Sequence, residues 1–170
     1  MMGKNSFNSK RLFAGFASML FCLPAIAVVK VSDSNSTSFH FSGIIEASCK
    51  ANGIADNNAA NMALTSANTS QDIGTLQVWC NTDNNASTKY TSANQGYLVD
   101  GNNKIAYTLN VGESSGDIDL TNEYINSNTS AGFGSNGDTE SHRLSITPQT
   151  NGLDSAGQYS DTITVTVAYN

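Results

Sequence analysis

The chain has 170 residues, a formal net charge of −6, and only 13% charged side chains. This length fits one domain, and low charge with abundant Asn, Ser, Thr and Gly argues against a helical bundle. Eight basic residues against fourteen acidic ones disfavour nucleic acids and anionic membranes as partners, because phosphate contacts need clustered Lys and Arg.

The first 27 residues have the three parts of a secretory signal peptide. Lys4, Lys10 and Arg11 precede an apolar run over residues 12–21, and an Ala-Ile-Ala cleavage site ends at residue 27. The apolar run is shorter than the ~20 residues that span a bilayer, so we expect export and no membrane insertion. Cleavage would remove three basic residues and no acidic ones, and the mature chain would carry a charge of −9.

Cysteine usage points to one disulfide. Cys22 is lost with the signal, which leaves Cys49 and Cys80 as an even pair in an exported chain. A bond between them would close a loop of about 31 residues and contribute roughly 3–4 kcal/mol. Cys49 and Cys80 have no second Cys pair nearby, and His40 and His142 are isolated in the sequence. These residues therefore form no cluster of metal ligands, and we expect no metal and no cofactor.

The first half of the mature chain contains two predicted strands. Residues 28–38 are polar and lack turn residues, and alternating apolar residues then predict a strand over residues 38–47. Residues 52–61 are rich in Asn, Ala and Asp, which is typical of a loop. Residues 75–80 alternate, with Leu76, Val78 and Cys80 on one face, which predicts a half-buried strand.

The second half is also strand-like. Residues 97–99 and 104–111 predict a hairpin joined by Asp-Gly-Asn-Asn, and residues 142–147 predict a strand that Pro148 stops. Residues 113–140 have sparse apolar residues, so we expect long loops and short strands there. Strands every ten or so residues, with turn signals between them, indicate a β-sandwich.

The last fourteen residues form the clearest strand pattern. One face carries apolar and aromatic residues, and the other carries Thr and Ala: Tyr159, Ile163, Val165, Val167 and Tyr169 against Thr162, Thr164, Thr166 and Ala168. An apolar edge of this kind is an aggregation hazard when it has no partner. A chain with such an edge and a loose N-terminal strand can polymerise by giving that strand to a neighbour.

At this point the sequence resembles the pilin subunits of chaperone–usher fimbriae of Gram-negative bacteria. The segment FHFSGIIEASC, residues 39–49, is similar to the family's first-strand pattern leading to its first Cys. Cys80 closes the segment GTLQVWC where the second Cys usually falls. Gly157, fourteenth from the end, and the penultimate Tyr169 match the C-terminal motif of the family.

The resemblance implies an incomplete immunoglobulin-like β-sandwich that lacks its final strand. The expected parts are a signal peptide at 1–27, a donor-strand extension at 28–38 and a pilin domain at 39–170. The implied donor strand presents Val29, Val31, Thr37, Phe39 and Phe41. The implied acceptor groove, which chaperone and usher also contact, contains Gly157, Tyr159, Ile163, Val165, Val167, Tyr169 and Asn170.

The function implied is that of a structural fimbrial subunit. It would fold with a periplasmic chaperone, pass an outer-membrane usher and polymerise with neighbouring subunits by donor-strand exchange, supporting adhesion from fimbriae on the cell surface. Two alternatives stay open: a subunit that itself binds a host glycan or protein through loops in residues 117–140, and a secreted protein resembling spore coat U. We expect no enzyme, because no G-x-S-x-G, phosphate loop or H-E-x-x-H occurs.

Overall fold

The computed structural model describes residues 36–65, 67–112 and 116–170. The predicted signal peptide and the donor residues Val29 and Val31 lie outside this part of the chain. The chain divides into two units, Met1–Ser42 and Gly43–Asn170, so the compact unit begins four residues after the boundary expected from the sequence. In the first unit, residues 36–42 form neither helix nor strand, and Phe39 and Phe41 are exposed.

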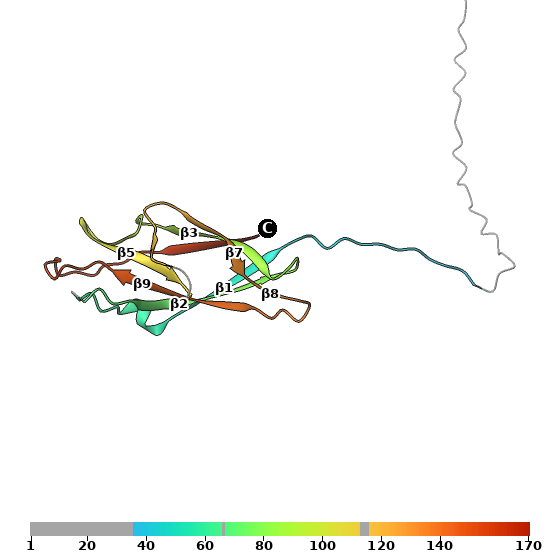
Figure 1. Cartoon of the computed structure of the whole chain (residues 1–170), viewed down its shortest axis with the longest axis horizontal. Coiled ribbons are helices and arrows are strands. Elements are labelled where there is room, and N and C mark those ends of the chain that lie inside the picture. Colours follow the sequence, from blue (N-terminus) through green and yellow to red (C-terminus); the bar gives the residue numbers. More distant parts are fainter. Residues whose placement is uncertain (1–35, 66, 113–115) are drawn as a thin grey trace, which may run out of the picture. The chain divides into compact units, whose positions relative to one another are not determined.

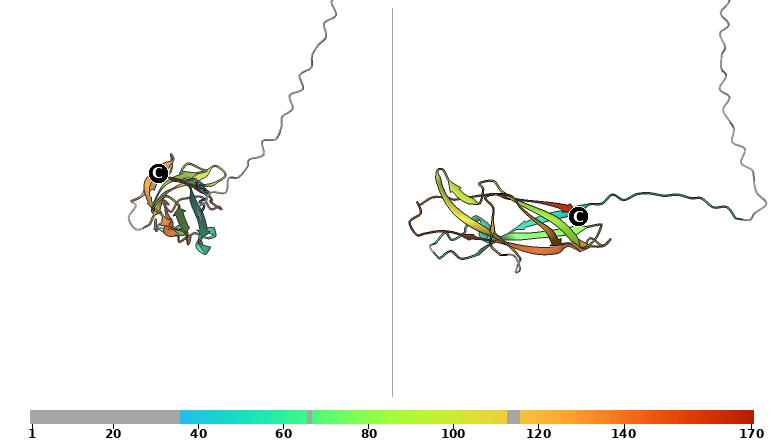
Figure 2. Two further views of the ribbon diagram at one scale, coloured as in Figure 1. Left: turned by 90° about the vertical axis from the view of Figure 1, so that its right-hand side faces the viewer. Right: turned by 45° about the horizontal axis from the view of Figure 1, so that its top comes forward.

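The compact unit is all-β, with two sheets (Figures 1 and 2). The larger sheet has the path β1-β2-β9-β5-β4, formed by β1 (Cys49–Ala55), β2 (Gln71–Cys80), β9 (Glu140–Pro148), β5 (Asn103–Val111) and β4 (Tyr97–Asp100). Two short strands join it, β6 (Ile118–Asp119) beside β5 and β8 (Gly132–Phe133) beside β2. The smaller sheet has the order β10-β3-β7, formed by β10 (Ile163–Tyr169), β3 (Asn85–Ser92) and β7 (Tyr124–Ser130).

Alternating side chains build one core between the sheets. Leu76, Val78 and Leu109 from the larger sheet are at most 3% exposed, and Ala86 and Tyr90 from the smaller sheet are fully buried within the same cluster. Two sheets that share one core are consistent with a β-sandwich. No helix in the described ranges is long and apolar enough to cross a membrane.

Several sequence predictions are confirmed. β2 contains the predicted strand over residues 75–80, and its buried face carries the expected alternate residues. β4 and β5 form the predicted hairpin, whose turn places Gly101 at φ 58°, a left-handed conformation that glycine adopts without strain. β9 covers the predicted strand over residues 142–147, and β10 holds most of the predicted C-terminal strand.

The predicted disulfide is also confirmed. Cys49 and Cys80 are bonded, with their Cα atoms 4.1 Å apart, and they face each other at the end of the β1–β2 ladder. Asn81 reinforces this corner, because its side-chain oxygen accepts a hydrogen bond from the Ser48 N–H at 2.7 Å and its side-chain nitrogen donates to the Glu46 carbonyl at 2.8 Å. The disulfide therefore fixes the start of β1 against β2.

Two predictions about the first half of the domain are wrong. Residues 38–47 form no strand, and residues 52–55, expected to lie in a loop, complete β1. The alternation in residues 38–47 was apolar enough for a strand, but a strand also needs a hydrogen-bonding neighbour. Low strand propensity in Asn52 and Gly53 is overridden by a seven-residue ladder with β2. β7, with seven residues, is also longer than the short strands expected in residues 113–140.

Candidate functional site

Two edge strands from different sheets lie beside each other on one side of the compact unit. In the described part of the chain, β1 pairs only with β2, and β10 pairs only with β3. β1 and β10 are close in space but form no ladder with each other. Each strand therefore keeps one row of backbone N–H and C=O groups without a strand partner, which is the feature that another strand can recognise.

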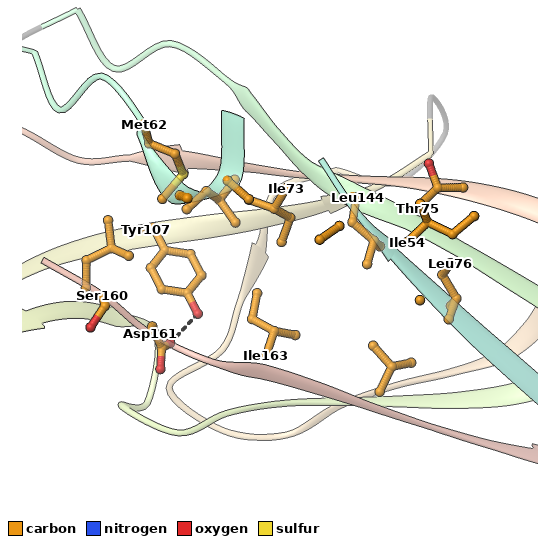
Figure 3. A pocket seen from close by; sticks show the side chains of 18 of the residues that line it. Ile54, Met62, Ile73, Thr75, Leu76, Tyr107, Leu144, Ser160, Asp161 and Ile163 are labelled. Atoms are coloured by element: carbon orange, nitrogen blue, oxygen red, sulfur yellow. Dashed lines mark hydrogen bonds between the residues drawn. The ribbon is translucent and has the colours of Figure 1, made fainter. Parts of the chain in front are cut away.

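A cavity of about 680 Å³ lies along these two strands (Figure 3). Its base is apolar and comes from the larger sheet, and a short 3₁₀ helix, η1 (Asn57–Ala60), and the residues after it cover one part. The main apolar side chains that line it are Ile54, Met62, Ile73, Leu76, Leu98, Leu144, Ile146, Ile163 and Val165. We call this cavity the β1–β10 groove.

Small side chains on β1 explain why the groove exists. Ala51 and Gly53 lie opposite Val78 and Leu76, so they are on the face of β1 that points toward the core. Both are nevertheless exposed, as is Ala55. A β-carbon added at Gly53 would meet no atom within 4 Å. The backbone of β1 therefore forms one wall of the groove, but its inward side chains are too small to fill the groove.

β10 supplies the opposite wall. Its inward residues Ile163, Val165 and Val167 are half-buried, while Thr164 and Thr166 between them are exposed. This is the alternation that the sequence predicts for the strand. The inward row is apolar and incompletely covered, so further burial of these side chains would be favourable.

One end of the groove is polar. The Asp161 carboxylate accepts a hydrogen bond from the Tyr107 hydroxyl at 2.5 Å (Figure 3). It also accepts hydrogen bonds from the Ser92 hydroxyl at 2.6 Å and the Asn94 backbone N–H at 3.0 Å. Burial raises the pKa of Tyr107, and the hydrogen bond to Asp161 raises this pKa further. The phenol therefore stays protonated and acts as the donor that anchors Asp161 beside Ser160 at the groove wall.

The structure brings part of the predicted groove set together. Tyr159, Ile163 and Val165 line the groove. Val167 packs against the core beyond its lining, and Gly157 lies against the Asp100 carboxylate, which a β-carbon at this position would overlap.

The remaining predicted residues lie elsewhere. Tyr169 is 53% exposed at the end of β10, and the Asn170 side-chain nitrogen donates to the Ser127 carbonyl at 2.9 Å. Thr37, Phe39 and Phe41 belong to the separate N-terminal unit.

The groove wall on β1 was missed from the sequence. The sequence predicts the first strand over residues 38–47, whereas the first strand of the structure is β1, whose lining of the groove begins at Ala51. The available signal was the alternation of small residues at positions 51, 53 and 55 directly after a disulfide cysteine. Because Ala and Gly are only weakly hydrophobic, this alternation gives little difference in hydrophobicity between the two faces, and an analysis of hydrophobic periodicity does not detect it.

Comparison with known proteins gives no family for this chain. No protein-family model matches it, and a search of curated proteins finds no significantly similar sequence. Inferences about function therefore depend on the residues and on the geometry of the groove.

Proposed function

We propose that this protein is a structural fimbrial subunit of the chaperone–usher type. In this proposal the two sheets are an incomplete immunoglobulin-like sandwich, and the β1–β10 groove is the place of the missing strand. The observation that carries it is the apolar groove bordered by two strand edges that have no ladder partner in the described residues. The proposed role is mechanical rather than catalytic.

The dimensions of the groove suit an added strand. β1 and β10 each have seven residues, so an extended segment of similar length, about 3.3 Å per residue, would run beside both. Such a strand would satisfy backbone groups on the two edges and place alternate side chains over Gly53 and Val165. Each apolar side chain buried in this way contributes roughly 1.5–3 kcal/mol.

The proposed donor is the N-terminal segment of the next subunit, from Val29 to Phe41. Phe39 and Phe41 are 85% and 91% exposed, and large apolar side chains that exposed commonly mark an interaction segment. Before assembly, a strand of a periplasmic chaperone would occupy the same groove. The usher would then exchange it for the donor, which places the finished fibre on the cell surface.

Filling the groove from inside tests the proposal. Gly53→Val adds a β-branched side chain into open space, so the subunit should fold and form its disulfide, whereas fibres should be lost because the donor is excluded. Fibres are counted by electron microscopy of cells with the chaperone and usher. Gly116→Val is the matched control, because a β-carbon there also meets no atom within 4 Å but Gly116 does not line the groove. Normal fibres from Gly53→Val would refute the proposed acceptor.

Removing the donor tests the other half of the joint. Replacing residues 28–38 with a Gly/Ser segment of equal length should leave chaperone complexes intact and stop fibre growth. The replacement keeps the tether length, so a loss of fibres reports on side chains rather than on reach. Wild-type fibre yield from this variant would show that residues 28–38 are not part of the donor strand.

A further inference from the structure

A second depression, of about 530 Å³, lies on the outer face of the β1–β2 pair. Lys50 pairs with Trp79 and Asn52 pairs with Gln77 in the ladder, so these four side chains share the face that points away from the core. The loop between β8 and β9 forms the third side with Ser135, Asn136, Gly137 and Thr139. We call this depression the Trp79 site. Among the residues that the structure describes, Ala51 alone borders both the Trp79 site and the β1–β10 groove.

Trp79 provides a fixed aromatic platform. Its indole Nε1–H donates to the Gly134 carbonyl at 3.0 Å, which sets the orientation of the ring against the β8–β9 loop. The ring is half-buried, and the Lys50 ammonium lies 5.5 Å from its centroid. Because exposed Lys50 is a flexible side chain, another group can take its place over the ring.

Amide groups beside the ring are incompletely used. The Asn52 side-chain nitrogen donates to the Gln77 side-chain oxygen at 3.1 Å, which orients both amides. Within the described part of the chain, the Gln77 amide nitrogen and the Asn52 amide oxygen have no hydrogen-bond partner. The Trp79 site therefore presents fixed donors and acceptors next to an apolar ring.

We propose that the Trp79 site binds a pyranose saccharide. One face of such a sugar is a patch of C–H groups that stacks on an indole, and its vicinal hydroxyls both donate and accept hydrogen bonds as Gln77 and Asn52 require. A single Lys is too little charge for a phosphorylated or nucleic-acid ligand. If the protein also forms fibres, each subunit adds one copy of the site, and weak individual sites gain avidity.

Trp79 makes the test direct, because it is the single tryptophan of the chain. The exported full-length protein is titrated with the methyl glycosides of glucose, galactose, mannose, N-acetylglucosamine and N-acetylgalactosamine. Tryptophan fluorescence and the single indole N–H resonance are followed, and the same protein is applied to a glycan array. At least one saccharide should shift the resonance in a saturable manner. Absence of a shift with every glycoside, together with a blank array, overturns the proposal.

Variants then assign the contact. Gln77→Ala should weaken binding of the active saccharide about tenfold, as expected for one lost hydrogen bond to a buried ligand group. Gln149→Ala is the matched control, since Gln149 is an exposed glutamine outside the Trp79 site. Equal affinity of the two variants would overturn the assignment. Both variants should form normal fibres, so the outcome is separate from that of the Gly53→Val experiment.

Discussion

The two sides of the compact unit differ in how completely they are closed. Where the chain crosses from β6 in the larger sheet to β7 in the smaller one, Ile118 and Leu120 are only 7% and 1% exposed. On the side of β1 and β10, the inward residues Ala51 and Gly53 remain exposed. Both sides have the same sheets above and below, so the difference comes from side-chain volume and from chain connectivity.

This contrast teaches where a fold can accept a partner. On the β6–β7 side, Ile118 of β6 and Leu120 of the crossing segment are buried in the core. The β1–β10 side is bordered by strands that come from distant parts of the sequence, and one of them offers only small inward side chains. A densely packed core resists changes in its side chains. Covering an unfilled apolar groove, in contrast, lowers the free energy because it removes apolar surface from water.

The largest effect should come from the disulfide, which holds the open side together. Cys49→Ala/Cys80→Ala should lower the free energy of unfolding by about 3–4 kcal/mol, because the 31-residue loop is no longer constrained in the unfolded chain. Urea unfolding followed by circular dichroism measures this. A change below about 1 kcal/mol would mean that β1 is held by its ladder alone.

A matched valine pair compares the interior with the groove wall. Val78 is fully buried on β2, whereas Val165 is half-buried on β10. Val78→Ala should cost about 2–3 kcal/mol through lost burial and a new cavity, and Val165→Ala should cost about 1 kcal/mol or less in the isolated subunit. Thermal or urea unfolding separates the two. Equal costs would show that the groove wall is already covered in solution.

The smallest effect concerns pH at the polar end of the groove. Burial raises the pKa of Tyr107 above its ordinary value of 10.0, so the folded state holds the phenolic proton more tightly than the unfolded chain does. Stability from this group is therefore full below pH 10 and falls as pH rises above the unfolded value. Tyr107→Phe should reduce the decline in melting temperature at alkaline pH. Burial also raises the pKa of Tyr90, so some decline should remain. An unchanged slope would contradict the prediction.

Sequence reasoning succeeded where side chains alternate with strong contrast. Leu76, Val78 and Cys80 on β2, and Ile163 and Val165 on β10, repeat every second residue among Thr and Gln, and both segments are strands. It failed at the strand edge that matters most for the groove. The apolar pattern of Phe39, Phe41 and Ile45 predicts a strand, but the structure has none there. The prediction failed because the pattern within one segment does not show whether a neighbouring strand is available for pairing.

The sequence by itself determined the all-β class, the Cys49–Cys80 pair and the inward face of the last strand. Each follows from local chemistry, namely strand propensity, an even cysteine count after the predicted signal peptide, and a period of two. Only the tertiary structure decided that β1 starts at Cys49, that Gly53 faces open space in the β1–β10 groove, and that Trp79 lies beside Gln77 and the β8–β9 loop. These features arise from the register between strands and from the packing of one sheet on another, which are long-range contacts that no short sequence window contains.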